Sequence, residues 1–143
     1  MRLEHSLVVR RPRADVFAFL AEVTKLPLWQ SSLVEVRAGT ERGPGARHTE
    51  VRSLMGRRIE QTLEVTVFEP PERLDYAVVD GPLALRVGHT LTEAADGQTR
   101  IDVVGEGDPG PLFRFVSPVV AAMVEAQSKT DFARLKQVLE AED

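Results

Sequence analysis

The C-terminal segment, Pro111 to Glu142, most constrains how this chain can fold, because its pattern predicts one long amphipathic helix. Its apolar residues recur at three- and four-residue steps and therefore share one side of the helix: Val120, Val124, Phe132, Leu135, Val138 and Leu139. Its charged residues fall mainly off this stripe: Glu125, Lys129, Arg134, Lys136 and Glu140. About 30 residues at roughly 1.5 Å each give a rod of about 45 Å, enough to cross a small domain. We therefore expect this helix to cover the rest of the chain.

Two features of this helix carry further information. Pro118, with Ser117 before it, can either begin the helix or kink it, and the sequence permits both. Polar residues also occupy the middle of the apolar stripe, where a helix packed in a core more often carries Leu or Ala: Gln127, Ser128, Thr130 and Asp131. This interruption indicates that the helix lines a cavity.

Composition limits the class of protein. With 143 residues and 43% apolar content, the chain fits a single domain over residues 1–143 that buries about 70% of its unfolded surface. It has no cysteine, which excludes disulfides, thiol catalysis and thiolate metal sites. No apolar run approaches the length of a signal peptide or a membrane span, so we expect a cytoplasmic protein. A net charge of -4 argues against a nucleic-acid surface. We expect the basic cluster Arg10, Arg11 and Arg13 to be a solvated corner.

Before the long helix, the hydrophobic period changes from helical to two. We predict a first strand at 3–9, a short helix at 13–22 after Pro12, and a second helical turn at 26–29. Further strands are predicted at 33–38, 46–54, 58–68, 74–78, 83–91 and 101–103, with a hairpin turn at Asp96-Gly97 and a hinge at 105–110. The expected fold is α+β: a curved antiparallel seven-stranded sheet wrapped around the long C-terminal helix, with two short helices after the first strand.

The alternation within strands predicts which residues share a face of the sheet. Three sets are expected to share a face each: Val34, Val36 and Ala38; Ile59, Gln61, Leu63, Val65 and Val67; and Leu83, Leu85, Val87, His89 and Leu91. Polar residues interrupt these inward faces and the helix stripe: His5, Gln61, Tyr76, His89 and Gln127. For each of them the alternative is a core or rim residue that is hydrogen-bonded locally.

Short motifs along nearly the full length resemble a known superfamily. They are the run 6–12 leading into Val16-Phe17, the run 26–29 before Val34-Glu35-Val36, and the runs 68–74, 97–101 and 132–136. In this order they resemble the START-like or SRPBCC superfamily, with its helix-grip fold, and within it the polyketide cyclase/dehydrase branch. Each motif alone is mostly turn or core chemistry, and together they are specific for the fold rather than for a reaction. The resemblance implies a deep cavity between sheet and helix that holds a hydrophobic small molecule.

The leading hypothesis is therefore binding of a hydrophobic or amphipathic small molecule, such as a lipid or a polyketide, without a cofactor or a metal. The residues expected to bind it are His5, Trp29, Gln61, Tyr76, Val87, His89, Met123, Gln127 and Asp131. Trp29 is either a core plug or a cavity wall. Asp131 faces either solvent or the cavity.

Two alternatives stay open. A cyclase or dehydratase would use His89 as general base, assisted by His5, with Gln61 or Tyr76 donating to the oxyanion. His48, which shares its parity with Glu50 and Arg52, is expected to be exposed, and the sequence has no zinc-ligand spacing, nucleophile elbow or dinucleotide fingerprint. The second alternative is a protein-interaction module that uses basic residues at a rim: Arg10, Arg11, Arg13, Arg57 and Arg58. The identity of the ligand and the oligomeric state are left open.

Overall fold

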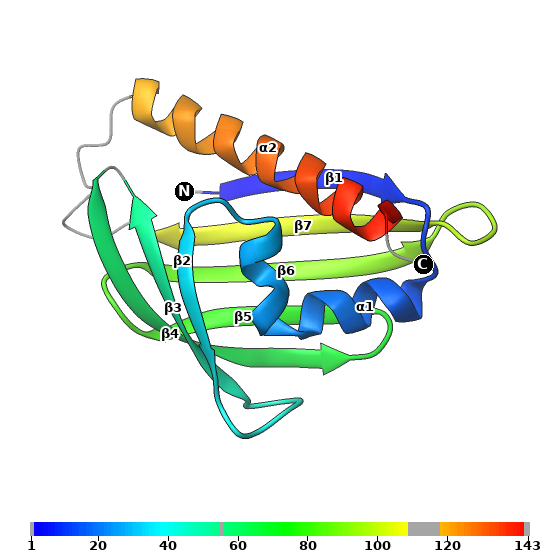
Figure 1. The fold of residues 1–143 in the computed structure, drawn as a ribbon, viewed down its shortest axis with the longest axis horizontal. Coiled ribbons are helices and arrows are strands. Elements are labelled where there is room, and N and C mark those ends of the chain that lie inside the picture. The colour runs from blue at the N-terminus through cyan, green and yellow to red at the C-terminus, as the bar shows by residue number, and fades with distance from the viewer. Residues whose placement is uncertain (1, 55, 109–117, 142–143) are drawn as a thin grey trace.

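In a computed structural model, which describes residues 2–54, 56–108 and 118–141, one antiparallel sheet carries a long helix across its concave side (Figure 1). The sheet has seven strands in the order β1-β7-β6-β5-β4-β3-β2. The elements are β1 (Arg2–Val9), α1 (Arg13–Ala21), the 3-10 helix η1 (Val23–Leu28), β2 (Leu33–Ala38), β3 (Arg47–Leu54), β4 (Arg57–Glu69), β5 (Arg73–Asp80), β6 (Ala84–Glu93), β7 (Thr99–Asp108) and α2 (Pro118–Ala141). The predicted fold class and order of elements are confirmed.

β7 lies between two breaks predicted from the sequence, a hairpin turn before it and a hinge after it. The predicted hairpin between β6 and β7 is present, with Gly97 at a φ of +71°, a left-handed conformation that glycine adopts without strain. β7 continues through Gly105 to Asp108, because Gly105 pairs with Leu3 of β1 and Asp108 pairs with Ala84 of β6. The predicted hinge at 105–110 is therefore wrong for 105–108, and 109–110 lie outside the described residues.

Register shifts in β2 and β4 curl the sheet and change which residues face inward. One shift lies between Leu33 and Glu35, so that Leu33 is buried while Val34 is 52% exposed. Another lies between Val65 and Val67, after which Phe68 packs edge-on against Phe17 of α1, with ring centroids 5.2 Å apart. Val34 therefore does not share a face with Val36, nor Val67 with Val65, and both expectations are wrong. A bulge adds one residue to a strand, which strict alternation cannot anticipate.

Helix α2 divides into a packed half and an exposed half. Leu135 and Leu139 are fully buried, and Phe132 and Val138 pack against the same core. Towards its start the helix is open, and Met123 is 63% exposed. The predicted helix from 111 is described only from Pro118, the first residue of α2, and the side chain of Val120 lies outside the described residues.

Polar side chains fasten α2 to the elements beside it. Asp131 accepts hydrogen bonds from the backbone N–H and the hydroxyl of Ser31, in the loop before β2. Arg134 Nε donates to the Leu28 carbonyl oxygen at 2.8 Å, and Lys136 Nζ donates to the Val8 carbonyl oxygen at 2.6 Å. These contacts hold α2 between β1, at one edge of the sheet, and the segment that leads into β2, at the other edge.

The three arginines between residues 10 and 13 each form an ion pair. Arg10 pairs with Glu140 of α2, Arg11 with Asp15, and Arg13 with Glu72 at 4.0 Å. Within the described residues, no helix is long and apolar enough to cross a membrane.

The packed half of α2 should account for most of the helix's contribution to stability. We expect Leu135→Ala to lower the free energy of unfolding by about 2–5 kcal/mol, because it empties a fully enclosed site. The control, Met123→Ala on the exposed half, should cost less than about 0.5 kcal/mol. Urea denaturation measures both, and equal costs would contradict this division of the helix.

Candidate functional site

A cavity of about 320 Å³ lies between the inner face of the sheet, helix α2 and the η1 segment. Its wall is mainly apolar and comes from strands β4 to β7, from α1 and η1, and from α2. The apolar residues are Leu20, Leu26, Leu63, Val78, Leu83, Leu85, Val87, Val103 and Phe132. Polar and charged side chains also line it, among them His5, Gln61, Tyr76, His89, Gln127, Lys129 and Asp131. This mixture is typical of small-molecule sites.

Most of the residues predicted from the sequence meet at this cavity. His5, Trp29, Gln61, Tyr76, Val87, His89, Gln127 and Asp131 all line it. Met123 does not, because it lies on the exposed half of α2. Whether the lining residues bind a ligand stays a prediction.

His89 is enclosed at one end of the cavity with one ring nitrogen unused. Its Nδ1 lies 2.8 Å from the carbonyl oxygen of Leu74 on the neighbouring strand β5. A carbonyl only accepts, so Nδ1 carries the proton and Nε2 keeps a lone pair. None of the described residues hydrogen-bonds to Nε2. Burial lowers the pKa of His89, partly offset by the bond to Leu74, so the neutral imidazole is favoured at neutral pH.

Tyr76 lies between two histidines on the cavity wall. Its ring centroid is 5.5 Å from that of His48 and 6.2 Å from that of His89, both nearly perpendicular. Its hydroxyl donates to the carbonyl oxygen of Leu20 at 3.1 Å. Burial raises the pKa of Tyr76, so the hydroxyl keeps its proton. The side chain therefore offers the cavity only oxygen lone pairs.

The prediction that His48 is exposed is wrong. His48 is 4% exposed and Glu50 is 3% exposed, and both face the cavity. His48 Nε2 lies 2.9 Å from Glu50 Oε2, and Arg52 Nη2 lies 2.7 Å from Glu50 Oε1. Arg52 also donates to Ser32 and to Gln30. Burial alone would raise the pKa of Glu50, but the His48 hydrogen bond and the Arg52 charge outweigh it and lower that pKa.

A signal for this cluster is present in the sequence but needs the strand register. His48 lies opposite Leu63 and Glu50 lies opposite Gln61. Opposite residues in an antiparallel pair project to the same face, so the predicted inward face of β4 extends to β3. Three alternating polar residues resemble a solvated face when β3 is considered alone. The remaining clue to this cluster is that a histidine, an acid and a base alternate along the strand and can pair with one another.

Gln61 sits at the other end of the cavity from His89. Its Oε1 accepts the backbone N–H of Leu83 at 3.0 Å, which leaves its Nε2 as a donor with no partner among the described residues. Gly81 makes room for this side chain, since a Cβ there would lie 2.9 Å from Gln61 Cγ. Leu83 and His89 are six residues apart, so the two ends are about 20 Å apart along the strand.

An aromatic group closes the cavity beside α2. Trp29, which is 3% exposed, has its ring centroid 5.4 Å from that of Phe132, and His5 stacks on Phe132 at 4.7 Å. Trp29 is therefore both a core residue and a cavity wall. Asp131 likewise combines both expectations, because it lines the cavity and is only half-buried.

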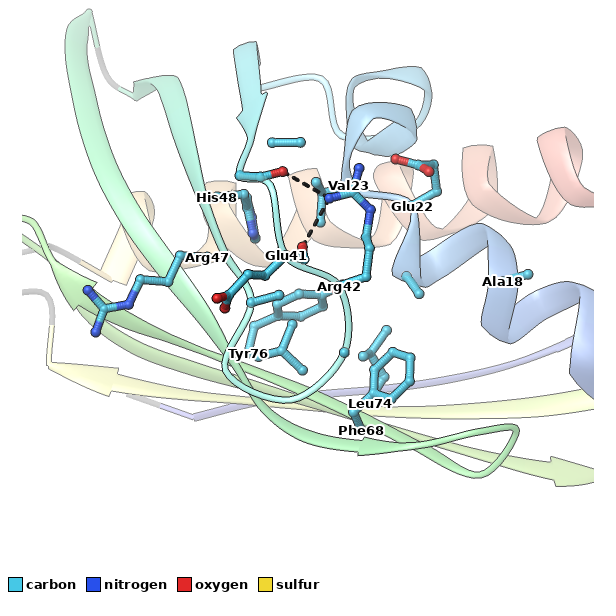
Figure 2. Close-up of a pocket in the computed structure, with 16 residues that line it drawn as sticks. Ala18, Glu22, Val23, Glu41, Arg42, Arg47, His48, Phe68, Leu74 and Tyr76 are labelled. Atoms are coloured by element: carbon cyan, nitrogen blue, oxygen red, sulfur yellow. Dashed lines mark hydrogen bonds between the residues drawn. The ribbon is translucent and has the colours of Figure 1, made fainter.

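A smaller cavity of about 170 Å³ lies under α1 and η1, beside the loop that joins β2 to β3 (Figure 2). Its mouth carries Arg42, whose Nη1 donates to the carbonyl oxygens of Gly39 and Glu41, drawn as dashed lines. His48 and Tyr76 belong to the walls of both cavities. The two cavities therefore meet at these two rings.

The arrangement offers a limited set of chemistry. It combines an apolar chamber with a neutral imidazole, a free amide donor and a buried ion pair. Among the described residues, no three histidine or acidic side chains come together as a metal site. Such a chamber can hold an amphipathic molecule, and the imidazole can accept a proton.

Comparison with known families gives one match. The sequence model described as "Polyketide cyclase / dehydrase and lipid transport" matches residues 1–140. A comparison with curated protein sequences gave no match.

Solved structures with the same fold cover the chain from end to end. The protein TTHA0849 from Thermus thermophilus has a TM-score of 0.82 at 13% identity, over 99% of this chain and 98% of that one. A protein from Rhodobacter sphaeroides has a TM-score of 0.73 at 22% identity, over 98% and 92%. The di-domain ARO/CYC StfQ from the steffimycin biosynthetic pathway has a TM-score of 0.71 at 15% identity, over 96% of this chain and 44% of StfQ. The likeness at these identities concerns the fold alone.

The buried Glu50 should stabilise the fold in a pH-dependent way. Its pKa is lower in the folded state, so its stabilisation is present above the ordinary carboxyl pKa of 4.5 and is lost as the pH falls through the folded-state pKa. We expect Glu50→Gln to lose about 1.5–3 kcal/mol of unfolding free energy near neutral pH, because two hydrogen bonds to a charged acceptor are weakened. The difference from the native protein should shrink below about pH 4.

Urea denaturation across this pH range measures the effect. Glu60→Gln, which removes the same charge from the exposed face of β4, should cost less than about 0.5 kcal/mol. A loss for Glu50→Gln that stays constant down to acid pH would contradict the linkage.

Proposed function

This chain belongs to the polyketide cyclase/dehydrase and lipid transport family, and on that premise we propose that it binds a hydrophobic or amphipathic small molecule in the large cavity. The observation that carries the proposal is the cavity itself, about 320 Å³ of space with a mainly apolar wall. Burial of a ligand's apolar surface there supplies the binding free energy, and the few polar groups orient it.

The polar residues support this proposal by their placement. His89, Tyr76 and Gln61 are each held by one hydrogen bond to backbone, so their side chains have fixed directions. Fixed polar groups lose little conformational entropy when a ligand arrives. We propose these residues, with Trp29 and Val87, as the ligand-binding wall, and a cytoplasmic location for the protein.

A blocking substitution tests the cavity directly. Val87 lies on the inner face of β6 and lines the cavity, so Val87→Trp should fill part of it. We expect this variant to bind the uncharged fluorescent probe N-phenyl-1-naphthylamine about tenfold or more weakly than the native protein, a loss of about 1.4 kcal/mol. Val79→Trp, on the exposed face of β5, is the matched control and should bind the probe unchanged.

Fluorescence titration with circular dichroism on each variant measures binding and folding together. Equal probe affinity in both variants would place binding outside this cavity. Native mass spectrometry of the protein purified from its own host would identify a retained ligand.

Catalysis is a second candidate, favoured by the free Nε2 atom of His89. A neutral imidazole at the end of the cavity can take a proton from a carbon between two carbonyl groups. The predicted oxyanion donors do not fit as expected. The Tyr76 hydroxyl donates to Leu20, and Gln61 lies about 20 Å along the strand from His89. The candidate therefore rests on His89 as base alone and ranks second.

Hydrogen–deuterium exchange at the acidic methylene of a benzoylacetyl thioester, followed by NMR, tests this candidate. His89→Gln should slow the protein-catalysed exchange by roughly 10²- to 10⁴-fold, the usual contribution of a general base. Thr90→Gln, one residue along and on the outer face of β6, should leave the rate unchanged. Unchanged exchange in His89→Gln would return the protein to the binding class.

A further inference from the structure

The end of the large cavity at His89 and Tyr76 presents hydrogen-bond acceptors. The proton of His89 is on Nδ1 and is used by the Leu74 carbonyl, so Nε2 offers a lone pair. The Tyr76 proton is used by the Leu20 carbonyl, so its oxygen offers lone pairs. Beside them, His48 Nε2 lies 2.9 Å from Glu50 Oε2 and donates to that carboxylate. Among the described residues, backbone carbonyls take the N–H of His89 and the O–H of Tyr76, so neither side chain has a free donor.

The charged groups nearby are already paired with each other. The Nε, Nη1 and Nη2 atoms of Arg52 donate to Glu50, Ser32 and Gln30. A carboxylate ligand that reached His89 and Tyr76 would lose its hydration and meet their lone pairs, and neither side chain would give it a donor. The cost of burying an anion would then stay uncompensated. A cation would meet Glu50 only in competition with Arg52, at 2.7 Å from the same carboxylate.

The wall that leads away from His89 is apolar. Val87, Leu85 and Leu83 follow it on the inner face of β6 and the turn before it, over about 20 Å. A ligand whose polar group reaches His89 therefore has its remaining length against aliphatic side chains. Gln61 marks the far end, with its amide Nε2 as a free donor.

We propose that the ligand is uncharged and donates an O–H or N–H hydrogen bond to Nε2 of His89, with its apolar body along Val87 and Leu85. The inference rests on the proposed binding function and narrows it to a ligand class. Phenols and other hydroxylated apolar molecules fit this end of the cavity. Carboxylates of the fatty-acid type, ethers and hydrocarbons do not, because each leaves the His89 lone pair without a donor.

Three probes that share one ring system separate these classes: 2-naphthol, 2-methoxynaphthalene and 2-naphthoate. We expect 2-naphthol to bind roughly 5- to 100-fold more tightly than the methyl ether, the effect of leaving one buried acceptor unpaired. 2-Naphthoate should bind most weakly at neutral pH. Isothermal titration calorimetry measures all three against the native protein.

A pair of variants assigns the preference to one side chain. His89→Phe should bind 2-naphthol and 2-methoxynaphthalene within about twofold of each other, because the acceptor is gone. Thr90→Phe adds the same ring one residue away on the outer face and should keep the full preference.

The nitrogen spectrum of the native protein gives a second measurement that needs no variant. The ¹⁵N resonance of His89 Nε2 should move upfield when 2-naphthol binds, as a lone-pair nitrogen does on accepting a hydrogen bond. It should stay in place with 2-methoxynaphthalene, which has no hydrogen to donate.

Each outcome decides between the two proposals. Equal affinity for the naphthol and its ether, tightest binding of 2-naphthoate, or an unmoved His89 resonance would each overturn the donor assignment while leaving cavity binding intact. If none of the three probes binds, the binding function itself fails.

Discussion

The concave face of the curled sheet must be covered, and helix α2 covers only part of it with apolar side chains. Leu135 and Leu139 seal the packed half, where they are fully buried. Nearer its start the helix offers Gln127, Ser128 and Asp131 to the same space. Protein interiors are packed as densely as organic crystals, so a space of about 320 Å³ is a marked departure. The cavity follows from the change in composition along this one helix.

The polar groups around the cavity are held in place by the backbone of the elements that form its wall. Carbonyls of Leu74 and Leu20 orient His89 and Tyr76, and the amide of Leu83 orients Gln61. These bonds satisfy one side of each polar group and leave the other side toward the cavity. A buried polar group is costly when it is unpaired. The remaining atoms therefore define what a ligand must supply.

The fold is shared with proteins of very different sequence. A TM-score of 0.82 accompanies 13% identity in one solved structure. Within this fold, His48, Glu50 and Arg52 form a paired cluster on the cavity wall. Function is decided by such side chains rather than by the fold, which hosts several activities.

The sequence by itself determined the order and type of the elements, the long helix as cover, and most inward-facing residues. The reason is that the hydrophobic period and the turn residues of each segment can be recognised without the rest of the chain. Only the tertiary structure decided the bulges that turned Val34 and Val67 outward. It also decided the burial of His48, which depends on its register with Leu63, and which nitrogen of His89 stays free. Each of these depends on a partner from another strand. Sequence periodicity describes one strand at a time, so it gives the face of a residue but neither its partner nor the atom left for chemistry.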